Sequence, residues 1–205
     1  EISNSHKQFV PLNQLPTQPQ HSADPLNLFF VVEAGDHHAT ILDGDKLEPI
    51  TRFKTRFALH GGAKYSPDGR FVYFATRDGW VTLFDLHSMQ QVAEIRAGIN
   101  TRNIAISSDG KLVAVGNYLP HNLVLLNAND LSLNTIIPVK SHGESSRVSA
   151  VYDAAPRKSF ILALKDLPEI WEIPYEAGKT GGWQHDYRTD AAEGNPRFTP
   201  RIIKL

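Results

Sequence analysis

The sequence has 205 residues, of which 41% are hydrophobic and 21% are charged, so it is long enough for one sizeable globular domain. Its formal net charge of −1 gives no electrostatic case for binding nucleic acid, and no run reaches the roughly 18 apolar residues that insertion of a membrane helix needs. The absence of cysteine excludes disulfides, thiolate metal sites, a cysteine nucleophile and a covalent c-type haem in this chain.

Residues 1–26 are rich in Gln, Pro, Asn and Ser and show no hydrophobic periodicity. This composition is typical of a linker, or of an extended arm that lies along a neighbouring element. Patterned sequence begins directly after it, so we predict one patterned domain over residues 27–205.

The patterned part of the chain is repetitive. Segments 39–50, 81–95 and 123–137 align at a spacing of 42 residues, and a looser copy covers 154–174. Each of the first three has a short apolar run, then Asp or Asn, a polar turn and a second apolar run. Such repeats, rich in short strands, are typical of β-propeller blades.

Turn signals support this interpretation. The pairs Asp68-Gly69 and Asp109-Gly110 lie 41 residues apart, and Asp-Gly suits tight turns because glycine accepts a positive φ without steric cost. Helix signals are poor, since the apolar runs are short and contain many Val, Ile, Phe and Leu residues. A β-sandwich is the alternative, but the regular spacing favours a propeller.

The repeats account for about four blades, at the low end of the usual range of about four to eight. The tail, residues 195–205, ends on the beginning of a further strand. We therefore predict an all-β fold in the form of a partial β-propeller. A second half, or another chain, would complete it and cover the open strand edge and the apolar blade faces.

His60 is the first candidate binding residue. It directly precedes Gly61 and Gly62, which carry no side chain that would keep a flat ligand away from the backbone. A neutral imidazole is a common ligand of iron. The alternative is a histidine that hydrogen-bonds a turn, or a structural Gly-His motif of the blade.

Three arginines occupy similar places in successive repeats, next to predicted strands: Arg77, Arg102 and Arg147. An arginine fork binds a carboxylate through paired hydrogen bonds, so three of them around one channel suit a ligand with several carboxylates. The alternative is ion pairing within the protein, with Asp78, Asp109 or Asp153 as partners.

Tyr118 and His121 flank the turn marked by Pro120, and either side chain can offer a hydrogen bond to a ligand. The alternative is a turn that packs against the next blade. His37 and His38 are expected to be solvated in a hairpin turn, and His185 carries no informative pattern. The sequence contains no G-x-S-x-G, H-E-x-x-H or P-loop motif.

Segments 57–86, 93–128 and 145–166 resemble the d1 domain of the cytochrome cd1 nitrite reductase family. The resemblance covers roughly residues 27–175, and it is strongest to the family's members in haem d1 biosynthesis. It implies an eight-bladed propeller, within the usual range of about four to eight. The central channel of that propeller would hold haem d1, an iron dioxo-isobacteriochlorin.

The resemblance also implies roles for individual residues. His60 matches the proximal axial ligand of the iron, while Arg77 and Arg102 match arginines that contact the cofactor's carboxylates. The resemblance assigns cofactor contacts less clearly to Arg147, Tyr118 and His121, because the family varies at these positions. The family's distal histidines and its c-haem domain have no counterpart in this sequence, so this chain alone should not reduce nitrite.

Three functions follow as expectations. The first is a periplasmic protein of the last step of haem d1 biosynthesis, which dehydrogenates dihydro-haem d1 and delivers the product to nitrite reductase, with a c-type cytochrome as a further partner. The second is the d1 domain of a nitrite reductase that converts nitrite to nitric oxide. The third is a non-catalytic propeller that binds a protein partner and no cofactor.

Overall fold

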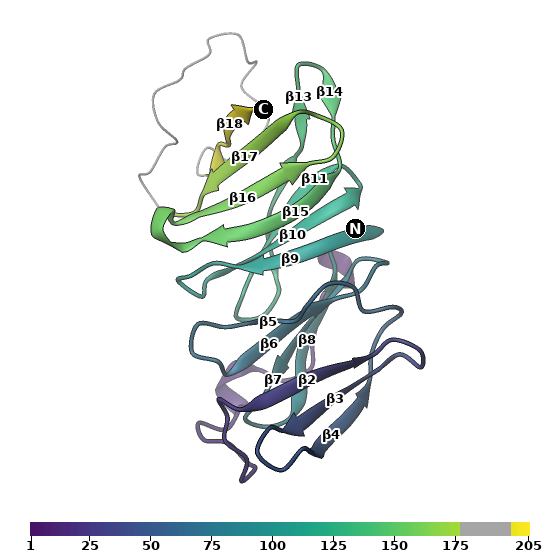
Figure 1. Ribbon diagram of the computed structural model, residues 1–205, viewed down its shortest axis with the longest axis vertical. Coiled ribbons are helices and arrows are strands. Elements are labelled where there is room, and N and C mark those ends of the chain that lie inside the picture. Colours follow the sequence, from purple (N-terminus) through teal and green to yellow (C-terminus); the bar gives the residue numbers. More distant parts are fainter. Residues whose placement is uncertain (177–197) are drawn as a thin grey trace.

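The computed structural model describes residues 1–176 and 198–205 and confirms the predicted all-β class. Within these ranges there is no α-helix, and the 3-10 turns η1 (Ser3–Ser5), η2 (Leu12–Gln14) and η3 (Ala155–Arg157) are short. None of the helical segments described is long and apolar enough to cross a membrane. Among the described residues, four antiparallel sheets have three or more strands. They follow one another along the long axis, as the blades of a propeller do (Figure 1).

The two middle blades each follow a simple up-and-down order. The second blade contains β5 (Lys64–Tyr65), β6 (Phe71–Ala75), β7 (Trp80–Asp85) and β8 (Gln90–Arg96). The third contains β9 (Asn100–Ile106), β10 (Leu112–Leu119), β11 (Asn122–Asn127) and β12 (Leu133–Pro138). In both, the first strand begins beside the connection from the preceding blade, which places the candidate residues at the same end of each sheet.

The two terminal blades differ in size. The first has three strands among the described residues: β2 (Leu28–Glu33), β3 (His38–Asp43) and β4 (Glu48–Lys54). The fourth contains β15 (Val148–Ala154), β16 (Ser159–Leu164), β17 (Glu169–Pro174) and β18 (Arg201–Lys204). A small hairpin, β13 (Lys140–Ser141) and β14 (Glu144–Ser145), lies in the connection from the third blade to the fourth. The strand expected in the tail is therefore the last strand of the fourth blade.

The repeats of the sequence map onto equivalent strands. The aligned runs form β3, β7 and β11, and the Asp or Asn that follows each run hydrogen-bonds the next turn. Asp85, for example, accepts a hydrogen bond from the backbone of Ser88 over 3.1 Å. The predicted Asp-Gly turns are confirmed, since Gly69 and Gly110 have φ angles of +75° and +70°.

Alternate residues of each strand pack on opposite neighbouring blades. In β6, Val72 and Phe74 face the first blade, while Tyr73 and Ala75 face the third. Because both faces of a middle blade are buried, its central strands, such as β6 and β10, are apolar almost throughout. At the outer face of the first blade, Phe29 is still 50% exposed.

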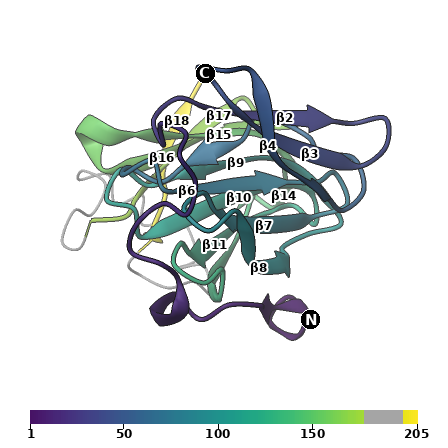
Figure 2. The same cartoon turned by 90° about the horizontal axis from the view of Figure 1, so that it is seen from below.

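The N-terminal segment lies along the outer strands. Its strand β1 (Lys7–Gln8) pairs antiparallel with β8, and Phe9 donates a backbone hydrogen bond to Val92. Leu15 of this segment is buried, and Arg70 reaches the carbonyl of Pro16 from the second blade. Figure 2 shows the segment on the side of the molecule that carries β8 and β11.

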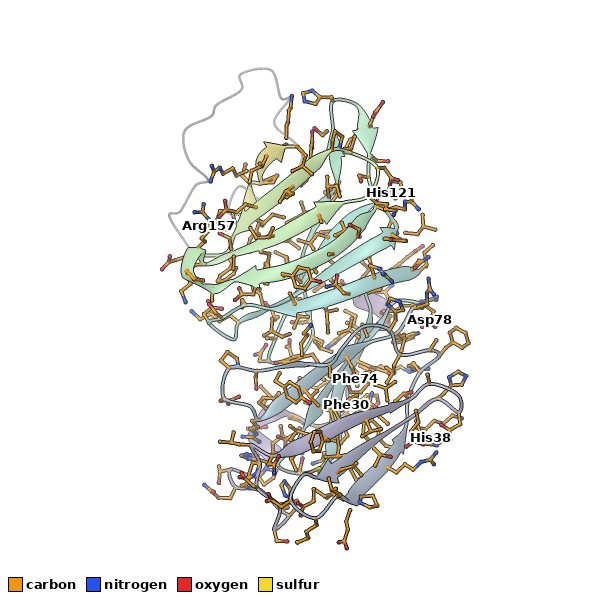
Figure 3. All side chains as sticks on the ribbon, in the orientation of Figure 1. Phe30, His38, Phe74, Asp78, His121 and Arg157 are labelled. Carbon is orange, nitrogen blue, oxygen red and sulfur yellow. The ribbon has the colours of Figure 1, made fainter. Side chains whose placement is uncertain are left out.

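The blade connections at one end form what we call the rim, residues 55–63, 76–79, 97–99 and 119–121. Backbone hydrogen bonds join neighbouring parts of it, such as Arg77 to Ala58 and Ile99 to Leu119. In Figure 3, His38, Asp78 and His121 mark this end along one side of the molecule. The candidate residues other than Arg147 lie at the rim or within a few residues of it, and Arg147 directly precedes β15.

Candidate functional site

His60 is held in the rim by its backbone. Its amide donates to the carbonyl of Ala75 over 2.9 Å, and its side chain is half-buried. Gly61 has a φ of +80°, which favours glycine, whereas a Cβ placed on Gly62 would meet no atom within 4 Å. The space beside His60 is therefore open on the glycine side.

Both ring nitrogens of His60 are hydrogen-bonded to Arg102. The Nδ1 lies 3.0 Å from the Arg102 carbonyl oxygen, and the Arg102 Nη1 lies 2.8 Å from Nε2. A carbonyl only accepts and a guanidinium only donates, so Nδ1 must carry the proton and Nε2 must offer its lone pair. The geometry thus fixes the neutral tautomer in which Nε2 is the ligating atom.

The backbone around Arg102 is fixed on both sides. Thr101 donates through its hydroxyl to Asn117 over 2.6 Å, and both residues are buried. Asn103 exchanges hydrogen bonds with the backbone of Val151 in the fourth blade, at 2.8 and 2.9 Å. The carbonyl that orients His60 is consequently part of a rigid strand, β9, while the Arg102 side chain extends from it.

Arg77 lies at an exposed position of the rim. Among the residues that the structure describes, its guanidinium has no hydrogen-bond or ion-pair partner, whereas its backbone bonds Ala58 and Thr101. It lines a recess of about 260 Å³ together with Phe57, Asp78, Ile99 and Asn100. A cation without a protein partner beside a recess is suited to bind an anionic ligand.

The other three candidates form a second group between the third and fourth blades. Arg147 donates to Asp166 through Nε over 3.0 Å and through its backbone amide over 2.9 Å. These bonds hold the pKa of Asp166 well below its ordinary value and raise that of Arg147. The Arg147 guanidinium also lies over the ring of Tyr118, at 5.3 Å, and His121 bonds the Ser145 hydroxyl over 2.7 Å.

The structure therefore separates the predicted residues into two groups. His60 and Arg102 are in direct contact, and Arg77 stands nearby on the same rim. Arg147 contacts Tyr118 and is already neutralised by Asp166, so it is less suited to a ligand's carboxylate.

The aspartates considered as alternative partners of the arginines have other partners. Asp78 accepts from the Thr76 hydroxyl, Asp109 from Ser107 and Asp153 from Tyr175. Sequence reasoning missed Asp166, because no local signal connects the β16–β17 turn with the beginning of β15.

Two further histidines differ from expectation. His37 and His38 are half-buried rather than solvated, and the His37 ring packs against Phe57 with centroids 5.3 Å apart. His38 bonds the carbonyl of Asp36 through Nδ1 over 2.8 Å. His185 lies outside the described residues.

Two relatives and one solved structure are similar to this chain. The chain is 64% identical over 180 residues to a dihydro-heme d1 dehydrogenase of Pseudomonas aeruginosa, covering 87% of this chain and 36% of the relative. It is 26% identical over 179 residues to a nitrite reductase of Stutzerimonas stutzeri, covering 84% of this chain and 31% of that one. Among solved structures, the dihydro-heme d1 dehydrogenase NirN in complex with DHE superposes with a TM-score of 0.88 at 57% identity, over 100% of this chain and 40% of that chain.

This chain spans between about a third and two fifths of the length of these relatives. The model of the cytochrome D1 heme domain family matches residues 23–191, which include all of the candidate residues and the four blades up to β17. The chain belongs to the cytochrome D1 heme domain family.

Proposed function

We propose that this chain is the haem d1-binding part of a periplasmic, NirN-type protein that acts in the last step of haem d1 biosynthesis. It would hold dihydro-haem d1 while the acrylate double bond is formed, and the product would pass to nitrite reductase. The observation that carries the proposal is the neutral His60, whose Nε2 lone pair points to the guanidinium of Arg102. The 64% identity to a dihydro-heme d1 dehydrogenase supports the choice of reaction.

The residues present fit an iron tetrapyrrole with carboxylates. His60 offers one imidazole nitrogen for axial ligation, Arg102 and Arg77 offer two cations at the same end of neighbouring blades, and Gly62 faces open space. When bound, haem d1 would supply the iron and the conjugated ring. The chain's own contribution would be to fix the tautomer of His60 and to orient the ligand through its carboxylates.

The remaining groups of a complete site must come from outside this sequence. The outer face of the first blade exposes Phe29 and Val31, and Tyr152 of the fourth blade is 59% exposed. We propose that a second half of the propeller, or another chain, covers these faces and supplies the distal side of the site. We propose a c-type cytochrome as the acceptor of the electrons, as the resemblance to the family implies.

A test is the absorption titration of haem d1 into the wild-type chain, His60→Ala and the control His38→Ala. His38 is a half-buried histidine at the same end of the blades (Figure 3). Among the described residues, its ring bonds only the carbonyl and the carboxylate of Asp36. We expect a saturable spectral shift with wild type and with His38→Ala, and its loss with His60→Ala. Equal shifts in all three chains would rule out His60 as the ligand, and binding by none would contradict haem d1 binding by this chain.

The d1 domain of a nitrite reductase is the second candidate, because the chain is also 26% identical to such an enzyme. The two functions differ in substrate. A protein that contains this chain within a complete propeller should convert dihydro-haem d1 to haem d1 under the first proposal, and should reduce nitrite under the second.

A further inference from the structure

Arg102 makes two contacts with His60 that have opposite consequences. Its backbone carbonyl fixes the tautomer that makes Nε2 a ligand, while its guanidinium donates a hydrogen bond to that same Nε2 over 2.8 Å. An imidazole nitrogen has one lone pair, which cannot bind an iron and accept this hydrogen bond together. The Arg102 guanidinium must therefore leave His60 before an iron can bind there.

The two parts of Arg102 differ in how firmly they are held. Thr101 and Asn103, on either side, are bonded to Asn117 and to the backbone of Val151, so the carbonyl of Arg102 stays in place. The guanidinium has one hydrogen-bond partner among the described residues, the neutral Nε2 of His60. The side chain can consequently rotate without disturbing the carbonyl that orients the ring.

Other arginines of this chain are held by carboxylates. Arg56 bonds Glu94, Arg147 bonds Asp166 and Arg157 bonds Glu172. The bond from the Arg102 guanidinium to His60 has a single neutral acceptor atom. A carboxylate brings a negative charge and can accept two parallel N–H bonds from the guanidinium, so a carboxylate that reaches Arg102 competes well against the imidazole. A carboxylate would have to displace an existing ion pair at those other arginines, but not at Arg102.

We propose that Arg102 couples carboxylate recognition to axial ligation. In the free protein its guanidinium covers Nε2 of His60, and a carboxylate on the ligand draws it away and frees the lone pair. A tetrapyrrole with no carboxylate within reach of Arg102 leaves Nε2 covered, so the pair selects for ligands that carry both an iron and an adjacent carboxylate. This inference rests on the proposed function, since it takes an iron tetrapyrrole as the ligand.

The test compares haem d1 with its methyl ester, in which the carboxylates are blocked. The proteins are the wild-type chain, Arg102→Met, His60→Ala and the control Arg52→Met. Methionine removes the guanidinium but keeps an unbranched side chain and the backbone carbonyl, while Arg52 lies on β4 and bonds Glu33 and Asp36. Axial ligation is followed by absorption and electron paramagnetic resonance, with no turnover required.

We expect wild type and Arg52→Met to bind the acid at least about tenfold more tightly than the ester. Arg102→Met should bind the ester at least about tenfold more tightly than wild type does, and the acid more weakly. His60→Ala should show axial ligation with neither. A factor of ten in affinity corresponds to about 1.4 kcal/mol, which is within reach of one such hydrogen bond.

The experiment distinguishes a failure of the proposed coupling from a failure of the proposed function. If the acid ligates His60 in wild type but Arg102→Met keeps the same preference for acid over ester, the coupling is overturned and the proposed function stands. If no protein ligates either compound, both are overturned. A second readout needs no tetrapyrrole: the nitrogen resonance of His60 Nε2 should differ between wild type and Arg102→Met, and identical resonances would also overturn the coupling.

Discussion

The side-chain amide of Asn117 and the hydroxyl of Thr101 meet at 2.6 Å in the buried space behind the rim. The same amide donates to the carbonyl of Ala97 over 2.9 Å and to Asn122 over 2.8 Å. One fully buried asparagine thus ties together the connection into β9, the strand itself and the β10–β11 turn. Arg102 follows Thr101 directly, so this network positions the carbonyl that orients His60.

Replacing Asn117 by Ala should destabilise the fold. It removes three hydrogen bonds and leaves buried polar groups on Ala97, Thr101 and Asn122 without this partner. We expect the free energy of unfolding to fall by about 2–4 kcal/mol, measured by urea denaturation. Asn134→Ala is the matched control, since Asn134 is exposed and makes one side-chain bond to Asn127. Equal effects of the two substitutions would contradict the role given to the network.

Substitution by alanine is expected to affect stability differently at two glycines of the rim, Gly98 and Gly62. A Cβ on Gly98 would lie 2.5 Å from Oδ1 of Asn117, whereas a Cβ on Gly62 would meet nothing within 4 Å. Gly98→Ala should therefore cost about 1–3 kcal/mol of stability through overpacking. Gly62→Ala should change stability by less than about 0.5 kcal/mol, because it is a surface substitution.

Gly62→Ala should nevertheless weaken the binding of haem d1, because the methyl group would occupy space beside His60. We expect a loss of about tenfold in affinity by absorption titration, with an unchanged urea midpoint. Unchanged affinity would show that the ligand does not approach the backbone at Gly62.

The ion pair of Arg147 and Asp166 predicts an acid-sensitive stability. Hydrogen bonds from Arg147 lower the pKa of Asp166 below its ordinary value of 3.8, so the folded state favours the ionised carboxylate. That contribution is present above the unfolded pKa and is lost as the pH falls through the folded one. Wild type should therefore lose more stability than Asp166→Asn on acidification from about pH 6 to about pH 2, measured by urea unfolding at each pH. An equal loss in both would contradict the pair's contribution.

The sequence predicted the parts of this fold that depend on local patterns. Gly69 and Gly110 turn the chain where the Asp-Gly pairs indicated, and the apolar runs that lead into Asp43 and Asp85 form the equivalent strands β3 and β7. These features follow from periodicity and turn chemistry, which act over a few residues.

The contacts of the site depend on the relative placement of distant segments, and the sequence could not give them. Arg102 lies 42 residues beyond His60, and their contact exists because neighbouring blades pack face to face. Likewise, nothing close to Arg147 indicated that Asp166 would neutralise it. Arg102 and Arg147 follow similar patterns in the sequence. Only the fold shows that Arg147 is paired with a carboxylate, whereas Arg102 has none among the described residues.

A last prediction compares Arg77, the unpaired arginine of the rim among the described residues, with Arg147, which is paired with Asp166. Arg77 has no side-chain partner among the described residues, so Arg77→Ala should leave the free energy of unfolding within about 0.5 kcal/mol of wild type. If its guanidinium binds a carboxylate of haem d1, the affinity should fall by about tenfold, which corresponds to about 1.4 kcal/mol.

Arg147→Ala is the matched comparison and should behave in the opposite way. It removes the partner of Asp166 and the cation over Tyr118, so stability should fall while the affinity for haem d1 changes little. Urea denaturation and absorption titration of the two variants, side by side, measure both quantities. A larger loss of affinity with Arg147→Ala than with Arg77→Ala would place the ligand at the second group of residues, because only a carboxylate seated there would compete with Asp166 for that guanidinium.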